Sequence, residues 1–139
     1  MINKNIIYRK ADAARKSLKR LRTKSGLSLE NFLQDADTQD TVLHHLQIAI
    51  QACIDIGQHI LSDEGWGMPG TLTEIAYTLE EHGVISQNHA SQIVQMFGFR
   101  NILVHDYMEI DLEKVYNIWT LNLDDIEAYL KAIFTHFDI

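Results

Sequence analysis

An arginine, a histidine and a tyrosine stand close together in the stretch FGFRNILVHDY, residues 97–107. Arg100 carries a planar fork of N–H donors that suits a phosphate group. His105 can accept or release a proton near neutral pH, and Tyr107 adds a hydroxyl group that donates or accepts a hydrogen bond. Together, side chains of these types could hold a phosphate group and transfer protons beside it.

Arg100 lies in the middle of the apolar side of an expected helix, residues 86–105. At about 100° per residue, that side also carries Ile93, Phe97 and Val104. Burial of an unpaired guanidinium is unfavourable. Three interpretations are therefore open: the side chain extends to water from a helix end, it pairs with a buried carboxylate, or it holds a transient anion. Asn101 and His105 are four residues apart and share an adjacent face.

The string RNILVHDY, residues 100–107, matches the R-x4-6-H-x-Y motif of ribonucleases of the HEPN superfamily. The wider string MFGFRNILVHDYMEIDLEKVY resembles the HepT toxins of that superfamily. The similarity extends over most of the chain, including IQACIDIGQHIL, the loop around Pro69, the EHGVIS turn and the closing amphipathic helix. The resemblance implies a HEPN-like helical bundle that forms a homodimer, with the two motifs in a shared cleft.

The resemblance also implies an activity, that of a metal-independent ribonuclease and toxin of a type VII-like toxin–antitoxin pair, with tRNA or mRNA as substrate. Arg100, His105 and Tyr107 are the motif positions that would be catalytic, and Asn101 is the usual residue after the arginine. In such chemistry His105 is the base or acid, and Arg100 stabilises charge on the phosphorus. Neither a metal ion nor a cofactor is expected. A symmetric dimer would supply a second motif histidine.

The partner that the resemblance implies is an MntA-like nucleotidyltransferase antitoxin, which would transfer AMP from ATP to Tyr107. The added bulk and phosphate charge would keep RNA out of the cleft. The alternative function is a non-catalytic HEPN binding module that recruits or regulates a nucleotidyltransferase. Intact Arg100, His105 and Tyr107 favour the enzyme, because a scaffold needs none of the three.

Helical periodicity extends over most of the 139 residues, which predict a single domain, 1–139, of the all-α class. The expected helices span residues 5–23, 38–61, 71–82, 86–105 and 111–137, and residues 27–36 form a short helical turn and connector. The periodicity predicts a buried apolar stripe on each of the first two helices: Ile7, Ala11, Ala14, Leu18 and Leu21 on the first, and Val42, Leu46, Ala49, Ile50, Cys53, Ile54, Gly57, Ile60 and Leu61 on the second. Asp37 is the expected N-cap of the second helix, and Thr71 with Glu74 matches a capping box. Five helices with short connections predict an up-and-down bundle.

Charge is distributed unevenly along the chain. Residues 1–24 hold nine basic residues and one acidic residue, whereas the rest holds three basic and eighteen acidic residues. The basic segment is either an anion-binding surface or a partner of acidic helices in its own fold or in another protein. The acidic run Asp106, Glu109, Asp111 and Glu113 is expected to be a solvated helix entry.

The remaining features indicate a cytoplasmic protein without a membrane partner. No apolar run reaches the roughly 20 residues of a membrane span, and Met1 leads directly into charged sequence without a signal peptide. Cys53 is the single cysteine, which fits a reducing compartment and is expected in the core. His44 and His45 point about 100° apart on a helix and make a poor metal-binding pair.

Overall fold

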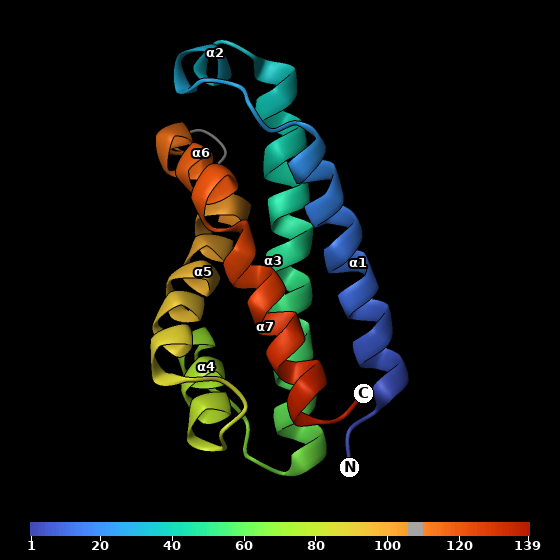
Figure 1. Ribbon diagram of the computed structural model, residues 1–139. Coiled ribbons are helices and arrows are strands. Elements are labelled where there is room, and N and C mark those ends of the chain that lie inside the picture. The colour runs from blue at the N-terminus through green and yellow to red at the C-terminus, as the bar shows by residue number, and fades with distance from the viewer. Residues whose placement is uncertain (106–109) are drawn as a thin grey trace.

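The computed structural model describes residues 1–105 and 110–139, with the backbone alone at 102, 104 and 105, and these ranges contain helices and no strand (Figure 1). The all-α prediction is confirmed. The described residues form seven helices: α1 (Lys4–Thr23), α2 (Leu29–Leu33), α3 (Ala36–Glu64), α4 (Leu72–Glu81), α5 (Gln87–His105), α6 (Leu112–Leu121) and α7 (Leu123–His136). None of the described helices is long and apolar enough to cross a bilayer.

The long helix α3 is the central element of the bundle. In Figure 1, α1 runs along one side of α3, α5 lies on the other side, and α7 crosses in front. Its predicted apolar face is confirmed, because every member is buried: Val42, Leu46, Ala49, Ile50, Cys53, Ile54, Gly57, Ile60 and Leu61. The opposite face of α3 remains polar and partly accessible, at His44, Gln47, Gln51, Asp55 and Gln58.

Helix α1 is amphipathic, and its predicted apolar stripe is also confirmed. The buried residues of α1 include Ile7, Ala11, Ala14, Leu18 and Leu21. Ser17 is buried beside them, and its hydroxyl group lies 3.2 Å from Nδ1 of His45 on α3. The charged side of α1 therefore faces away from the core.

The start of α3 differs from the prediction, since the N-cap is Asp35 and not Asp37. The Asp35 carboxylate accepts hydrogen bonds from the backbone N–H and the hydroxyl group of Thr38, at 3.1 and 2.7 Å. These bonds lower the pKa of Asp35. The threonine hydroxyl gives Asp35 a second bond that selects it as the cap. Residues 29–33 form the short helix expected before α3.

The single closing helix expected at residues 111–137 is wrong, because the chain divides at Asn122 into α6 and α7. Asn122 leaves helical geometry, and its side-chain amide donates to the Asp125 carboxylate at 3.0 Å. The interruption allows Leu123 to be buried while Leu121 stays exposed. The Asn122 side chain makes no capping hydrogen bond to the backbone of α7, and its contact with the helix is the bond to the Asp125 side chain.

Of the two hydrogen bonds of the capping box predicted at α4, the threonine bond forms and the glutamate bond goes to a neighbouring residue. The Thr71 hydroxyl accepts from the backbone N–H of Glu74 at 3.3 Å, as expected. The Glu74 carboxylate accepts from the backbone N–H of Gly70 at 2.6 Å, one residue before the cap. The carboxylate therefore fixes the loop that leads into α4.

Candidate functional site

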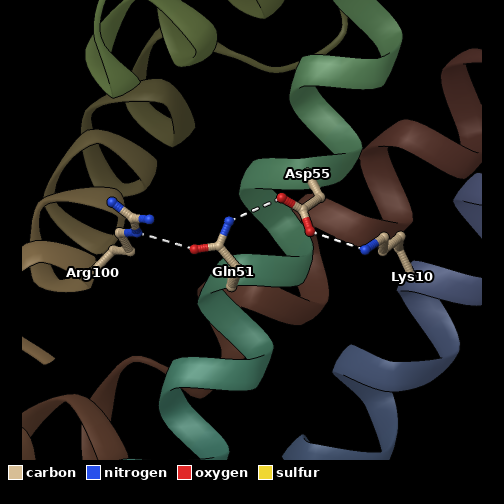
Figure 2. Close-up of polar contacts among 4 residues, drawn as sticks. All are labelled: Lys10, Gln51, Asp55 and Arg100. Carbon is tan, nitrogen blue, oxygen red and sulfur yellow. Dashed lines mark hydrogen bonds and ion pairs between the residues drawn. The ribbon is translucent and has the colours of Figure 1, made fainter. Parts of the chain in front are cut away.

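Arg100 lies on α5, where its side chain is half-buried beside the buried residues Met96 and Phe97. Its Nε–H donates a hydrogen bond to the Oε1 atom of Gln51 on α3, at 3.0 Å (Figure 2). The costly position predicted for this arginine is thus relieved by an amide oxygen. The bond uses one edge of the guanidinium and orients its plane relative to α3.

Asp55 and Lys10 extend the contacts of Gln51 on the side away from Arg100. The Nε2 group of Gln51 donates to Oδ1 of Asp55 at 2.9 Å, one helical turn along α3. The other Asp55 oxygen, Oδ2, pairs with the Lys10 ammonium of α1 at 3.0 Å. Figure 2 shows the resulting row of contacts, which crosses from α5 over α3 to α1.

The structure narrows the three interpretations of Arg100. The ion pairs found among the described residues are Lys10–Asp55, Lys16–Asp12 and Arg22–Asp124, and none includes Arg100. Structural pairing with a carboxylate is therefore not seen within residues 1–105 and 110–139. A side chain that reaches water and one that holds a transient anion both fit the observed partial burial.

A hollow of about 440 Å³ lies beside Arg100. Its wall combines the loop before α4 and its first residues with one side of α5; the lining residues are Gln58, Pro69, Gly70, Thr71, Leu72, Thr73, Val94, Gly98, Arg100 and Asn101. Hydroxyl, amide and guanidinium groups meet there, and no described carboxylate lines it. The hollow is chemically suited to an anionic or polar ligand.

The other predicted site residues are placed to different extents. Asn101 is exposed, and its Oδ1 lies 3.5 Å from Nη1 of Arg100, which is a weak contact. His105 is the last residue of α5, and only its backbone is described. Tyr107 lies outside the described residues. The structure therefore brings Arg100 and Asn101 together and leaves the placement of the other two side chains as a prediction.

The basic segment of residues 1–24 forms α1 and its flanks. Of its nine basic residues, Lys10, Lys16 and Arg22 pair with described carboxylates, and Arg15 lies over the ring of Phe134 at 4.8 Å. The other five have no described carboxylate within 4 Å, and they are exposed: Lys4, Arg9, Lys19, Arg20 and Lys24. Most of the basic side chains of this segment therefore face solvent and do not form ion pairs within the described residues.

The acidic run after α5 is only partly described. Asp111 caps α6, and its carboxylate accepts from the backbone N–H groups of Glu113 and Lys114 at 3.1 and 3.3 Å. Both Asp111 and Glu113 are exposed, which confirms the solvated helix entry for these two residues. Asp106 and Glu109 lie outside the described residues.

The remaining titratable candidates have structural surroundings. His44 and His45 stack edge to face, and burial, His44 and Arg20 together lower the pKa of His45. Burial raises the pKa of the Cys53 thiol well above its usual value, which confirms this cysteine as a core residue. No group of three or more His, Cys, Asp or Glu side chains in the described part could hold a metal ion.

A second hollow, of about 360 Å³, lies where the end of α1 meets α6 and α7. Trp119 forms part of its wall, and the indole N–H donates to the Leu21 carbonyl at 2.8 Å. Arg22 and Asp124 pair across its rim at 2.9 Å. Its charged groups already satisfy each other, so the Arg100 hollow is the better candidate for a reaction.

Gln51 was missed as a functional candidate from the sequence. A signal was present, because Gln51, Asp55 and Gln58 interrupt the apolar run IQACIDIGQHIL at spacings of four and three residues. Such spacing places polar residues on one face of a helix. What the spacing did not indicate was that this face meets Arg100.

Comparison with known proteins places these features in context. Residues 14–133 match the family described as Ribonuclease HepT-like. The protein named mRNA nuclease HepT, from Shewanella oneidensis strain MR-1, is 33% identical over 129 residues, covering 93% of this chain and 96% of the relative. A tRNA nuclease HepT from Aphanizomenon flos-aquae is 30% identical over 128 residues, covering 92% and 87%.

Two solved structures share the fold. One is a tri-AMPylated Shewanella oneidensis HEPN toxin in complex with an MNT antitoxin, with a TM-score of 0.84 and 32% identity, covering 94% of this chain and 97% of that chain. The other is YutE from Bacillus subtilis, a cytosolic protein of unknown function, with a TM-score of 0.84 and 15% identity, covering 99% and 92%. The second likeness concerns the fold alone.

Proposed function

This chain belongs to the HepT-like ribonuclease family, and we propose that it is a ribonuclease toxin that cleaves tRNA or mRNA without a metal ion. The observation that carries the proposal is the setting of Arg100. Its guanidinium is held by an amide rather than by a described carboxylate, and it borders a hollow with polar walls. An arginine in this state keeps its charge available for a phosphate group.

The proposed reaction uses the ribose 2′-oxygen as nucleophile on the adjacent phosphorus. His105 removes the 2′-OH proton as the P–O2′ bond forms, and an acid protonates the 5′-oxygen as the P–O5′ bond breaks. Arg100 donates hydrogen bonds to the phosphate oxygens as charge builds on them. Asn101 supports the arginine, and Tyr107 bonds to the phosphate or orients a neighbouring group.

A homodimer would complete this site. The reaction needs both a base and an acid, and each chain offers one motif histidine. On an α-helix, the Cα atoms of Arg100 and His105 differ by about 140° around the axis. In a symmetric pair the same surface patch of each protomer meets its copy, so residues of one chain can serve the other. We therefore place one His105 from each protomer in a shared cleft.

The exposed positive charge of α1 supports RNA as the substrate. Lys and Arg side chains that face solvent attract nucleic acid through its phosphates, without regard to sequence. This attraction would offset the acidic residues elsewhere in the chain, whose net charge over all 139 residues is −7. A protein that cleaves tRNA or mRNA would act in the cytoplasm, where these RNAs are found.

The test is cleavage of cellular tRNA and of an mRNA transcript by purified, unmodified protein in EDTA. The expected result is cleavage by the wild type and its loss, by a factor of about 100 or more, in His105→Ala. His44→Ala is the matched control and should cleave at the wild-type rate. Binding of RNA without cleavage would instead favour the non-catalytic HEPN binding module.

We further propose that an MntA-like nucleotidyltransferase antitoxin silences the protein by transferring AMP from ATP to Tyr107. The Tyr107 oxygen attacks the α-phosphorus of ATP, pyrophosphate leaves, and the phenolic proton passes to solvent or a base. The AMPylation reported for the Shewanella toxin supports this proposal. The added phosphate would repel RNA from the cleft.

Mass spectrometry of the toxin purified with its antitoxin tests this mode of silencing. The expected result is an AMP adduct on a peptide that contains Tyr107, and its absence in Tyr107→Phe. Inactive toxin with an unmodified tyrosine would show that the antitoxin acts by covering the site.

A further inference from the structure

The row of contacts behind Arg100 assigns a role to a residue outside the motif. We propose that Gln51 is a positioning residue, which holds the Arg100 guanidinium at the angle that phosphate binding requires. The inference rests on the proposed ribonuclease function and adds a residue of α3 to its machinery. It starts from the 3.0 Å hydrogen bond between Nε of Arg100 and Oε1 of Gln51.

The chemistry of the neighbours fixes the orientation of the Gln51 amide. Arg100 has only donors, so the atom that faces it must be the amide oxygen. An ionised Asp55 has only acceptors, so the atom that faces it must be the amide nitrogen, which lies 2.9 Å away. A flipped amide would lose both bonds and set like groups against each other. Asp55 thereby keeps the Gln51 oxygen turned toward Arg100.

Lys10 completes the arrangement by holding Asp55. Its ammonium lies 3.0 Å from the second Asp55 oxygen, with side-chain exposures of 38% for Lys10 and 25% for Asp55. At such exposure the pair adds little to stability because solvent screens it. The pair instead acts on orientation. Lys10 fixes the Asp55 carboxylate, the carboxylate orients the Gln51 amide, and the amide orients the Arg100 guanidinium.

An amide at this position leaves the charge of Arg100 available. A carboxylate in direct contact would neutralise the arginine and compete with an incoming phosphate. Gln51 separates the Asp55 carboxylate from the guanidinium by one neutral group. The amide takes only Nε–H, and Nη1 has Asn101 Oδ1 at 3.5 Å, so donors of the guanidinium stay available to a ligand in the 440 Å³ hollow that Arg100 lines.

Gln51 acts through Arg100 and not on the substrate itself. It does not line the hollow beside Arg100 and Asn101; it lines a separate hollow of about 350 Å³ with Lys10 and Asp55. A substrate group seated beside Arg100 would meet the arginine before it met Gln51. The effect of changing Gln51 should therefore depend on which residue occupies position 100.

Steady-state cleavage of tRNA by the purified protein tests this dependence with two substitutions. Gln51→Met keeps the length of the side chain and removes both bonds, so kcat should fall about tenfold or more because a misplaced group stabilises the transition state poorly. Gln51→Glu places a charge against Arg100, so KM should rise as the carboxylate competes with RNA phosphate. Gln47→Met, one turn earlier on α3, is the matched control and should leave both constants unchanged.

A double-mutant cycle separates positioning from a structural role. In an Arg100→Lys background, Gln51→Met should change kcat/KM by less than twofold, because lysine has no Nε–H fork to orient. An equal loss in both backgrounds, or wild-type cleavage by Gln51→Met, would overturn the inference. Thermal melting of each variant checks that the compared proteins are folded. If Gln51→Met does not fold, Gln51→Glu replaces it in the double-mutant cycle.

Failure of this inference is distinguishable from failure of the proposed function. If the wild type does not cleave RNA, both the proposed function and the inference fail. If Arg100→Lys cleaves much more slowly than the wild type while Gln51→Met cleaves at the wild-type rate, only the inference fails. A ¹H–¹⁵N spectrum of the arginine Nε groups adds a readout without substrate. The Arg100 Nε–H should exchange slowly with water in the wild type and rapidly in Gln51→Met; equal exchange would contradict the hydrogen bond.

Discussion

The two faces of α3 differ in chemistry and, on this account, in purpose. On the buried face, α3 meets α4 and α7 so closely around Gly57 that a side chain has no room there. On the opposite face, Gln51 and Asp55 hold polar contacts to α5 and α1 at a partly accessible surface. One helix thus serves both as the centre of the core and as the support of the candidate site.

The buried face depends on close packing and a satisfied polar atom. A Cβ atom at Gly57 would lie 2.5 Å from Cγ2 of Ile75 and 2.9 Å from the Tyr129 hydroxyl. That hydroxyl donates to the Cys53 carbonyl at 2.8 Å, in a buried setting. Burial raises the pKa of Tyr129 well above its usual value, so the phenol stays neutral and keeps its donor.

The comparison teaches that stability and function should respond to different substitutions on the same helix. Changes on the buried face should lower the free energy of unfolding and leave the rate of cleavage per folded molecule intact. Changes to Gln51 or Asp55 on the polar face should lower the rate of cleavage and leave the free energy of unfolding nearly unchanged. The hydrogen bonds of this face are partly solvated and contribute little net stability.

The largest expected effect on stability is that of Gly57→Ala. The added methyl group clashes with both Ile75 and Tyr129. The free energy of unfolding, measured by urea denaturation, should therefore fall by about 1–3 kcal/mol. Gly98→Ala is the matched control on α5, because nothing lies within 4 Å of a Cβ atom there. The control should be stabilised by up to about 1 kcal/mol, and a loss equal to that of Gly57→Ala would break the comparison.

A smaller effect is expected for Tyr129→Phe, which removes the hydroxyl group but keeps the ring. The Cys53 carbonyl loses one buried hydrogen bond, so the free energy of unfolding should fall by about 1 kcal/mol. Tyr77→Phe on α4 is the control, because Tyr77 is exposed and should change stability negligibly. A Tyr129→Phe protein as stable as the wild type would show that the close approach at Gly57 alone governs this face.

The smallest effect concerns pH and His45 of α3, which contacts α1 and is not part of the polar face. The pKa of His45 is lowered by burial, by His44 and by Arg20, and Ser17 lies 3.2 Å from Nδ1. Below pH 6.5 the unfolded chain binds a proton more readily than the folded one, so stability is full above that pH and declines as pH falls.

Urea denaturation at pH 7.5 and pH 5.5 checks the sign of this effect. The wild type should lose more stability than His45→Asn over that interval, because asparagine does not titrate and its amide can hydrogen-bond to Ser17 in either direction. An identical loss in both proteins would assign the pH dependence to other histidines.

The sequence predicted the fold well where one face of a helix carries the apolar residues. Every residue predicted for the stripes of α1 and α3 is buried, because an apolar period of 3.6 residues places those side chains on one face of a helix. Ser17, Ala52 and Ile56 are buried as well and were not predicted. The boundary at Asn122 was missed because neither glycine nor proline marks it. The N-cap of α3 was misplaced because residues 35–37 (DAD) contain two aspartates that could both cap the helix. Asp35 takes this role because it also accepts from the hydroxyl group of Thr38.

The site was predictable in type but not in its contacts. The unusual position of Arg100 in an apolar stripe pointed to a partner, and its spacing to His105 matched the family motif. The identity of the partner, Gln51, depends on how α5 packs against α3 across 49 residues of sequence. Pattern within one helix carries no information on the register between two helices.

Single-turnover cleavage by Arg100→Ala in EDTA tests the central claim most directly, with urea denaturation on the same sample. The account predicts a loss in rate of about 100-fold or more, at a stability within about 0.5 kcal/mol of the wild type. Cleavage at the wild-type rate by a folded Arg100→Ala protein would contradict it.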